Sequence, residues 1–152
     1  MDIYTLIHDD HRKAKEAIAA IKALPDERYA ERIKLFRPLK ADLILHNESE
    51  EESFYAMLRQ NSRTSEDVER SEKEHSEAAA MLDDLDGDDM TPEEWRLKFD
   101  ALCAALMDHI AKEEGRVFEK ARTVLSERTA IELAQKMERL KKEKQALVQK
   151  AS

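Results

Sequence analysis

The sequence has very few of the residues that form turns. Only two glycines and three prolines occur among 152 residues. Because all-β folds need turn residues at each reversal of the chain, this scarcity argues against sandwiches and barrels. Phe, Tyr and Trp together supply only 5% of the chain, so little of the aromatic material favoured in strands is present. Ala, Leu, Glu, Lys, Arg and Met are abundant instead, and these residues favour long helices.

Cysteine and long apolar runs are also scarce. Cys103 is the only cysteine, so the chain cannot form an intramolecular disulfide, which suits a reducing compartment. Asp2, Asp9 and Asp10 interrupt any apolar run at the start, so we expect no signal peptide. No window approaches the ~20 apolar residues that a membrane span needs. These absences predict a cytoplasmic protein with no membrane partner.

The charge balance is acidic. The chain has 26 basic and 34 acidic residues, for a net charge of −8. An excess of negative charge disfavours non-specific binding to nucleic acid, so we expect no nucleic-acid partner. The basic residues near the C-terminus alternate with Glu138 and Glu143, which indicates a solvated helix face.

Caps and apolar periodicity predict five helical segments in a single domain spanning residues 1–152. Ser65 is the expected N-cap of the third segment and Ser126 that of the fifth, while Thr91 and Glu94 form a capping box at the fourth. Pro38 removes a backbone donor inside the second, where we expect a kink. The segments cover about residues 2–24, 27–60, 65–85, 92–124 and 127–148.

Four long amphipathic helices with short connections predict an all-α fold, an antiparallel up-down four-helix bundle over about residues 2–124. The additional C-terminal helix, about 127–148, also carries an apolar face. That face could pack against the bundle or on a second subunit, so both a monomer and a homodimer remain open.

Each bundle helix has an apolar stripe at three- and four-residue spacing, and each stripe is interrupted by polar residues. On the second helix the stripe continues beyond the polar positions to Phe54 and Met57. The polar members are His11 on the first helix, His46 and Glu50 on the second, His75 on the third, and His109 and Glu113 on the fourth.

These polar residues form a candidate metal site. A separation of four places His46 and Glu50, and likewise His109 and Glu113, on one helix face. Buried carboxylates are costly unless a cation pairs with them. Imidazole and carboxylate together suit iron, manganese, zinc or cobalt, and six candidates exceed the four ligands of a structural zinc site. Two ions bridged by the glutamates fit the pattern better than one, and the alternative is a polar core network satisfied by internal hydrogen bonds.

The ordered motifs resemble the hemerythrin-like, or HHE cation-binding, family over about residues 2–122. The stretches that carry the resemblance are IYTLIHDDH at 3–11, HNESEEESFY at 46–55, EH at 74–75 and HIAKEEGRVF at 109–118. The resemblance implies a four-helix bundle with a carboxylate-bridged non-haem di-iron centre: two iron ions bridged by an oxo, hydroxo or water ligand. The family ligands it implies are His11, His46, Glu50, His75, His109 and Glu113.

One departure from the family pattern concerns the third helix. In the family that this chain resembles, the oxygen-carrying hemerythrins have two histidines on the third helix. Here a second histidine four residues before or after His75 is absent, because those positions are Ser71 and Ala79. Glu72, His8 or a water molecule could replace the missing ligand. An open position on iron favours reaction with peroxide, oxygen or nitric oxide over a role as a reversible oxygen carrier.

Three functions follow from this reading, and the sequence leaves open whether the protein is an enzyme. The first is a protein that binds or senses oxygen, nitric oxide or a related small ligand. The second is a di-iron oxidase or peroxidase, catalase-like, in oxidative or nitrosative stress defence. The third is a structural or regulatory helical module without a redox role.

Other polar and aromatic residues near these motifs are assigned ordinary roles. His8 is expected to be partly exposed. Tyr4 and Tyr55 could lie near the site, although core packing is the default for both, and Met57 is expected to fill the core. Glu48, Glu51 and Glu52 are expected to form a solvated face, one of them orienting a ligand imidazole.

Overall fold

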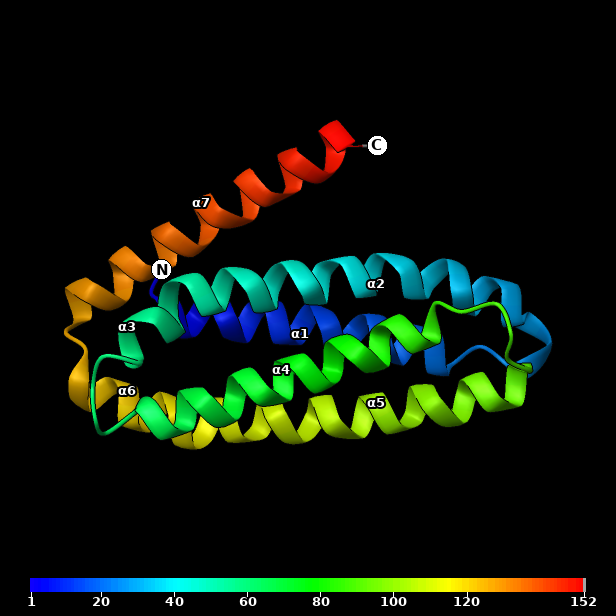
Figure 1. Ribbon diagram of the computed structural model, residues 1–152, viewed down its shortest axis with the longest axis horizontal. Helices are drawn as coiled ribbons and strands as arrows, with labels where there is room; N and C mark the ends of the chain where they lie inside the picture. The colour runs from blue at the N-terminus through cyan, green and yellow to red at the C-terminus, as the bar shows by residue number, and fades with distance from the viewer. Residues whose placement is uncertain (152) are drawn as a thin grey trace.

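A computed structural model describes residues 1–151 and shows four antiparallel helical columns with a fifth long helix outside them (Figure 1). The first column is α1 (Ile3–Lys22) and the third is α4 (Ser65–Leu85). The second and fourth columns are each divided by a π-helical turn. In order along the chain, the remaining elements are η1 (Asp26–Arg28), α2 (Tyr29–Glu50), η2 (Glu51–Tyr55), α3 (Ala56–Leu58), α5 (Pro92–Lys112), η3 (Glu113–Val117), α6 (Phe118–Val124) and α7 (Glu127–Ala151). The predicted all-α bundle is confirmed.

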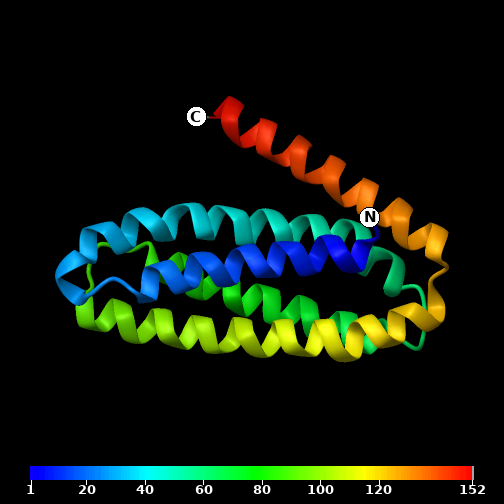
Figure 2. The same ribbon diagram turned by 180° about the vertical axis from the view of Figure 1, so that it is seen from behind.

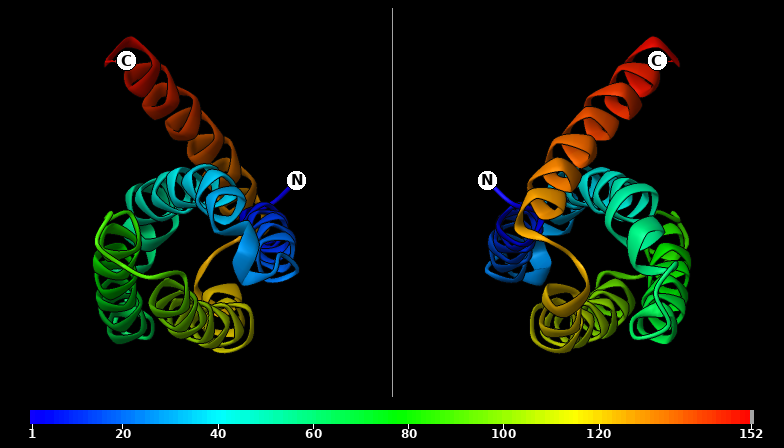
Figure 3. Two further views of the ribbon diagram at one scale, coloured as in Figure 1. Left: turned by 90° about the vertical axis from the view of Figure 1, so that its right-hand side faces the viewer. Right: turned by 90° about the vertical axis from the view of Figure 1, so that its left-hand side faces the viewer.

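The end views show the four columns at the corners of a square, with α7 on its outer side (Figure 3). Helix α7 packs across α1 and α2, and its C-terminal end points away from the bundle (Figures 1 and 2). Ala130, Leu133, Ala134 and Met137 are buried in this contact. The apolar face of the last helix therefore packs on its own chain.

The predicted caps are largely present. Thr91 Oγ1 accepts a hydrogen bond from the Glu94 amide at 3.1 Å, and Glu94 accepts one from the Thr91 amide at 3.3 Å, which completes the capping box. Ser126 caps α7 by accepting from the Thr129 amide at 3.1 Å. The prediction for Ser65 was wrong by one residue, because Thr64 takes the capping position and Ser65 is the first residue of α4.

The main helical irregularities lie at the two π turns. Pro38, where the sequence predicts a kink, lies on the exposed face of α2, and the helix continues through it. The π turn of η2 shifts the buried face of the second column by one residue, because it adds a residue to the turn. Met57, predicted to lie in the core, is consequently 38% exposed, and Leu58 is buried in its place.

The apolar core is divided into two clusters with a polar layer between them. On α1, for example, Ile7 belongs to one cluster and Ile18 to the other, and His11 lies between them. Cys103 is buried within the second cluster. Among the described residues, no helix combines the length and apolar character needed to cross a membrane.

Candidate metal centre

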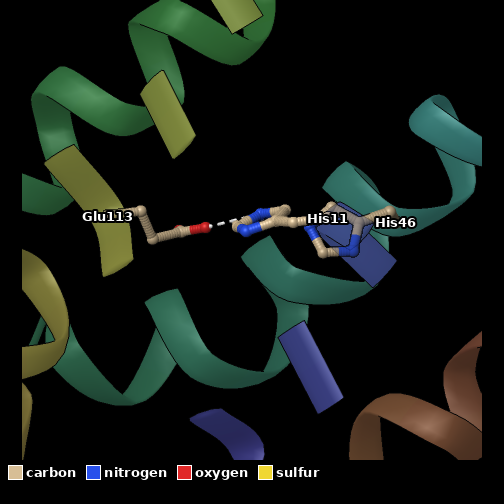
Figure 4. A group of neighbouring side chains, drawn as sticks. All are labelled: His11, His46 and Glu113. Carbon is tan, nitrogen blue, oxygen red and sulfur yellow. Dashed lines mark ion pairs between the residues drawn. The ribbon is translucent and has the colours of Figure 1, made fainter. Parts of the chain in front are cut away.

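The polar layer contains all six of the residues that the sequence predicts as ligands, and each is at most 7% exposed. They fall into two groups of three, and within each group one potential ligand atom per residue lies within 4.8 Å of the others. The groups are His11, His46 and Glu113, drawn in Figure 4, and Glu50, His75 and His109. The bundle thus brings together side chains from all four columns.

The two glutamates connect the two groups. Glu50 Oε1 lies 3.3 Å from His75 Nε2 in its own group and 3.6 Å from His46 Nε2 in the other. Glu113 Oε1 lies 4.0 Å from His109 Nε2 and 3.1 Å from His11 Nε2. Each carboxylate therefore contacts imidazoles of both groups, which is the placement that a bridging ligand requires.

The outward-facing nitrogen of each imidazole lies near a second carboxylate. His11 Nδ1 donates to Glu114 at 2.7 Å, His46 Nδ1 to Asp10 at 2.7 Å, and His109 Nδ1 to Glu74 at 2.8 Å. His75 Nδ1 lies 3.6 Å from Glu51 Oε2. A carboxylate at Nδ1 keeps the proton there, so the Nε2 lone pair is free to bind an ion at the centre.

These four outer carboxylates were largely missed by sequence reasoning. Only Glu51 was among the residues considered for orienting an imidazole. A sequence signal exists, because an acidic residue adjoins a candidate ligand on every helix. The carboxylate does not serve that adjacent ligand: Asp10 precedes His11 but bonds His46, and Glu74 precedes His75 but bonds His109. Neighbouring residues on a helix point about 100° apart, so the carboxylate meets the ligand of the next column.

Tyr55 also belongs to the centre, a place that the sequence left open for it beside the default of core packing. Its hydroxyl donates to Glu113 Oε2, and its ring stacks on His75 with centroids 5.4 Å apart. The hydroxyl also meets Ser71, one of the two positions at which the third helix could have carried a second histidine. Tyr4, by contrast, packs edge-on against Phe54 in the apolar core.

The electrostatics of the two glutamates differ. Burial raises the pKa of Glu50 to about 8, and repulsion from Glu113 adds to this effect. Burial also opposes ionisation of Glu113, but its ion pair with His11 outweighs this and lowers the pKa of Glu113. The pair thus holds its negative charge mainly on Glu113.

The four imidazoles divide in the same way. Burial favours neutral imidazole, and it lowers the pKa of both His46 and His109. At His11 and His75 the neighbouring carboxylates outweigh the effect of burial on the pKa. Glu113 raises the pKa of His11 to about 9, and Glu50 with Glu51 raises that of His75 to about 10. In the absence of a metal ion, the protons of the centre therefore lie mainly on His11, His75 and Glu50, and His46 and His109 are neutral.

Unpaired buried atoms show that the residues fit a metal. His46 Nε2, both oxygens of Glu50 and Glu113 Oε1 are buried without a hydrogen-bond partner among residues 1–151. Carboxylate oxygens left in this state are costly unless a cation binds them. Nitrogen and oxygen donors of this kind suit iron, manganese, zinc or cobalt. The six inward-facing side chains can therefore hold metal ions.

Comparison with known protein families agrees with this geometry. A family model described as the hemerythrin HHE cation-binding domain matches residues 2–121. The chain belongs to this family. The match covers the bundle and ends before α7, so this hemerythrin-like chain carries its last helix outside the matched region. No curated protein and no solved structure gives a significant match.

Two of the candidates for a further ligand in this hemerythrin domain lie away from the centre. Glu72 is ion-paired with Arg59 at the surface. His8 is mostly exposed and contacts Glu114 at 3.1 Å, on the outer side of the imidazole layer. Neither side chain is part of the two groups of three. The prediction that His8 would be partly exposed is confirmed.

Two cavities lead to the centre of this hemerythrin domain. A cavity of about 240 Å³ between α1, α2, α5 and α7 reaches His11, His46 and His109. A second of about 150 Å³ between α2, α4 and α5 reaches His75 and His109. The exposed surface of the larger one is mostly apolar, although charged side chains such as Asp42 and Lys141 also line it. A small molecule of low polarity can therefore approach the imidazoles from this side.

Proposed function

We propose that this protein is a non-haem di-iron protein that binds or senses oxygen, nitric oxide or a related small ligand. The observation that carries the proposal is the division of the six buried ligands into two groups of three joined by both glutamates. One ion would not need two groups, and a network held by hydrogen bonds would not leave both oxygens of Glu50 without a hydrogen bond.

In this proposal, His11 and His46 would hold one iron, His75 and His109 would hold the other, and Glu50 and Glu113 would bind both. The iron pair would supply the redox change and the open positions for a small ligand. The chain itself does the positioning. The outer carboxylates keep each Nε2 directed inward, Tyr55 holds one oxygen of Glu113, and the larger cavity, with its mostly apolar surface, admits a ligand of low polarity.

The acidic surface and the single buried cysteine support placing the protein in the cytoplasm, without a nucleic-acid partner. The apolar part of α7 that lies on the bundle is already covered, which favours a monomer over a homodimer.

A second candidate function is a di-iron oxidase or peroxidase, catalase-like in character. Three protein ligand atoms per group would leave each ion with open positions, and Tyr55 contacts Ser71, one of the two third-helix positions where a further histidine could have stood. The larger cavity also exceeds the space that a diatomic molecule needs, since one water occupies roughly 30 Å³ of liquid. A peroxide could reach the ions by this route.

Metal analysis of variants tests the centre directly. We expect two irons per chain in protein loaded anaerobically and then oxidised, with an absorption band in the near ultraviolet. His11→Ala and His75→Ala should each lose about one ion, because each removes a ligand from a different group. His8→Ala is the matched control and should keep both, because His8 lies outside the centre. A single zinc per chain, or two irons retained in both variants, would refute the assignment.

Reaction with oxidants separates the two functions. If the protein binds or senses oxygen, the reduced form should give an adduct that reverses when oxygen is removed. If it is a peroxidase, added hydrogen peroxide should be consumed over many turnovers. Turnover that persists unchanged in Glu113→Ala would place the activity outside this centre.

A further inference from the structure

We propose that Lys141, on the C-terminal helix α7, is a positioning residue for the metal centre, acting on His46 through Asp10. This inference rests on the proposed two-metal centre and concerns a helix that lies outside the family match. It assigns α7 a role in metal binding at one of the two groups of ligands.

The contact is direct and partly shielded from solvent. Lys141 Nζ binds Asp10 Oδ2, and the same oxygen accepts the hydrogen bond from His46 Nδ1 at 2.7 Å. The side chains of Lys141 and Asp10 are 20% and 15% exposed, so water screens their interaction less than it screens a surface pair. Lys141 also lines the larger cavity that reaches His11 and His46.

The origin of this cation distinguishes it from the others around the centre. Glu114 contacts the imidazole of His8, on α1, and Glu74 lies 3.4 Å from Lys112, on α5. Both of these partners belong to the bundle itself. Asp10 is the outer carboxylate whose cation, in the part of the chain that the structure describes, comes from α7. The attachment of α7 is therefore linked to only one imidazole of the centre.

An ammonium group at Asp10 has two physical consequences. It restricts the carboxylate to the orientation in which Oδ2 faces His46, and a correctly oriented outer carboxylate improves metal binding by the imidazole. It also draws part of the negative charge of the Asp10 carboxylate away from His46 Nδ1. Without Lys141, Asp10 could turn towards solvent, because the carboxylate would have lost one of its two partners.

A second lysine on α7 separates this effect from simple docking of the helix. Lys144 pairs with Glu48 and Glu52 on the second column and contacts none of the four outer carboxylates. It attaches α7 to the bundle without touching the ligands of the centre. Lys142 is exposed and provides the matched charge control.

The test is a Co²⁺ titration of the metal-free full-length chain, followed by calorimetry and by the visible bands of bound cobalt. Lys141→Met keeps the apolar stem and removes the charge. We expect it to weaken one of the two cobalt ions by about tenfold, the low end of the effect of losing an outer partner, and to change the bands of that ion alone. Lys144→Met and Lys142→Met should stay within about twofold of the parent, and Lys141→Arg should restore most of the loss.

Three results would overturn the proposal. Equal affinities for Lys141→Met and Lys142→Met would show that the Asp10 contact has no effect on the metal. An equal loss in Lys144→Met would assign the effect to docking of α7 and not to Lys141. If the parent chain binds no pair of ions, the two-metal centre fails and this role fails with it. A parent that binds two ions while Lys141→Met is unchanged refutes only the role of Lys141.

Discussion

Metal loading should release protons, and the two groups of ligands should differ in how many they release. Near pH 7 and without metal, His11 and His75 are protonated because their pKa values are about 9 and 10, and Glu50 is largely protonated because its pKa is about 8. A ligand must lose its proton before it binds an ion. The group containing His11 should therefore release one proton, and the group containing Glu50 and His75 should release two.

The magnitude follows from these proton counts. Each proton displaced changes the binding constant about tenfold per pH unit, or about 1.4 kcal/mol. Raising the pH from about 6 to about 7 should therefore strengthen binding about tenfold at the His11 group and about a hundredfold at the Glu50 group. Binding should strengthen as the pH rises, because protons compete with the metal for these ligands below their pKa values. The dependence should flatten as the pH approaches the range from about 8 to about 10, where the groups lose their protons unaided.

Calorimetric titration with Zn²⁺ in buffers of different ionisation enthalpy measures the number of protons released. Zinc is suitable because it binds the same donors without redox change. In His75→Ala, which should retain the His11 group, the number should fall to about one. Affinity that does not change between about pH 6 and 7, or a total release well below one proton, would refute the proposed charge distribution in the metal-free centre.

Three further substitutions test individual interactions by urea unfolding. Tyr55→Phe removes the donor to Glu113 and should destabilise the metal-free protein by about 1–3 kcal/mol. The control is Tyr4→Phe, which should change stability by less than about 0.5 kcal/mol because the Tyr4 hydroxyl has no hydrogen-bond partner among residues 1–151. Equal effects of the two substitutions would argue against the Tyr55 bond. Asp67→Asn should cost about 1–3 kcal/mol at neutral pH, because a lysine and two arginines outweigh burial and lower the pKa of this carboxyl. That contribution is present above the ordinary value of 3.8 and is lost as the pH falls through the lower folded pKa, so a difference that persists at still lower pH would contradict it. Gly115→Ala should stabilise by about 0.5–1 kcal/mol, since an added Cβ meets nothing within 4 Å, and a loss would show that the π turn needs glycine.

The helices and the six side chains of the buried polar layer could be predicted because both depend on local spacing. The capping box at Thr91 and the cap at Ser126 are signals contained within four residues. His46 with Glu50, and His109 with Glu113, share a helix face wherever the helix lies. An apolar stripe interrupted by such a pair indicates a buried polar site, and the structure places all six side chains in one layer.

The π turns limited this reasoning. Each begins at or immediately after a candidate glutamate, and the extra residue rotates everything that follows on the column. Regular helical spacing therefore assigned Met57 to the core, although Leu58 lies there. For the same reason Tyr55, which follows the predicted stripe residue Phe54, is directed at the centre. No local residue pattern predicted the change from the α-helical to the π-helical repeat.

Spacing along the chain thus determined the bundle, its buried polar layer and the side chains able to hold metal, because all of these follow from the helical repeat. The outer carboxylates, the role of Tyr55 and the attachment of α7 were decided only in the folded protein. Each depends on which column stands beside which, and Lys141 meets Asp10 across 131 positions of sequence. Contacts of that kind depend on the packing of whole helices, which the repeat within one helix does not specify.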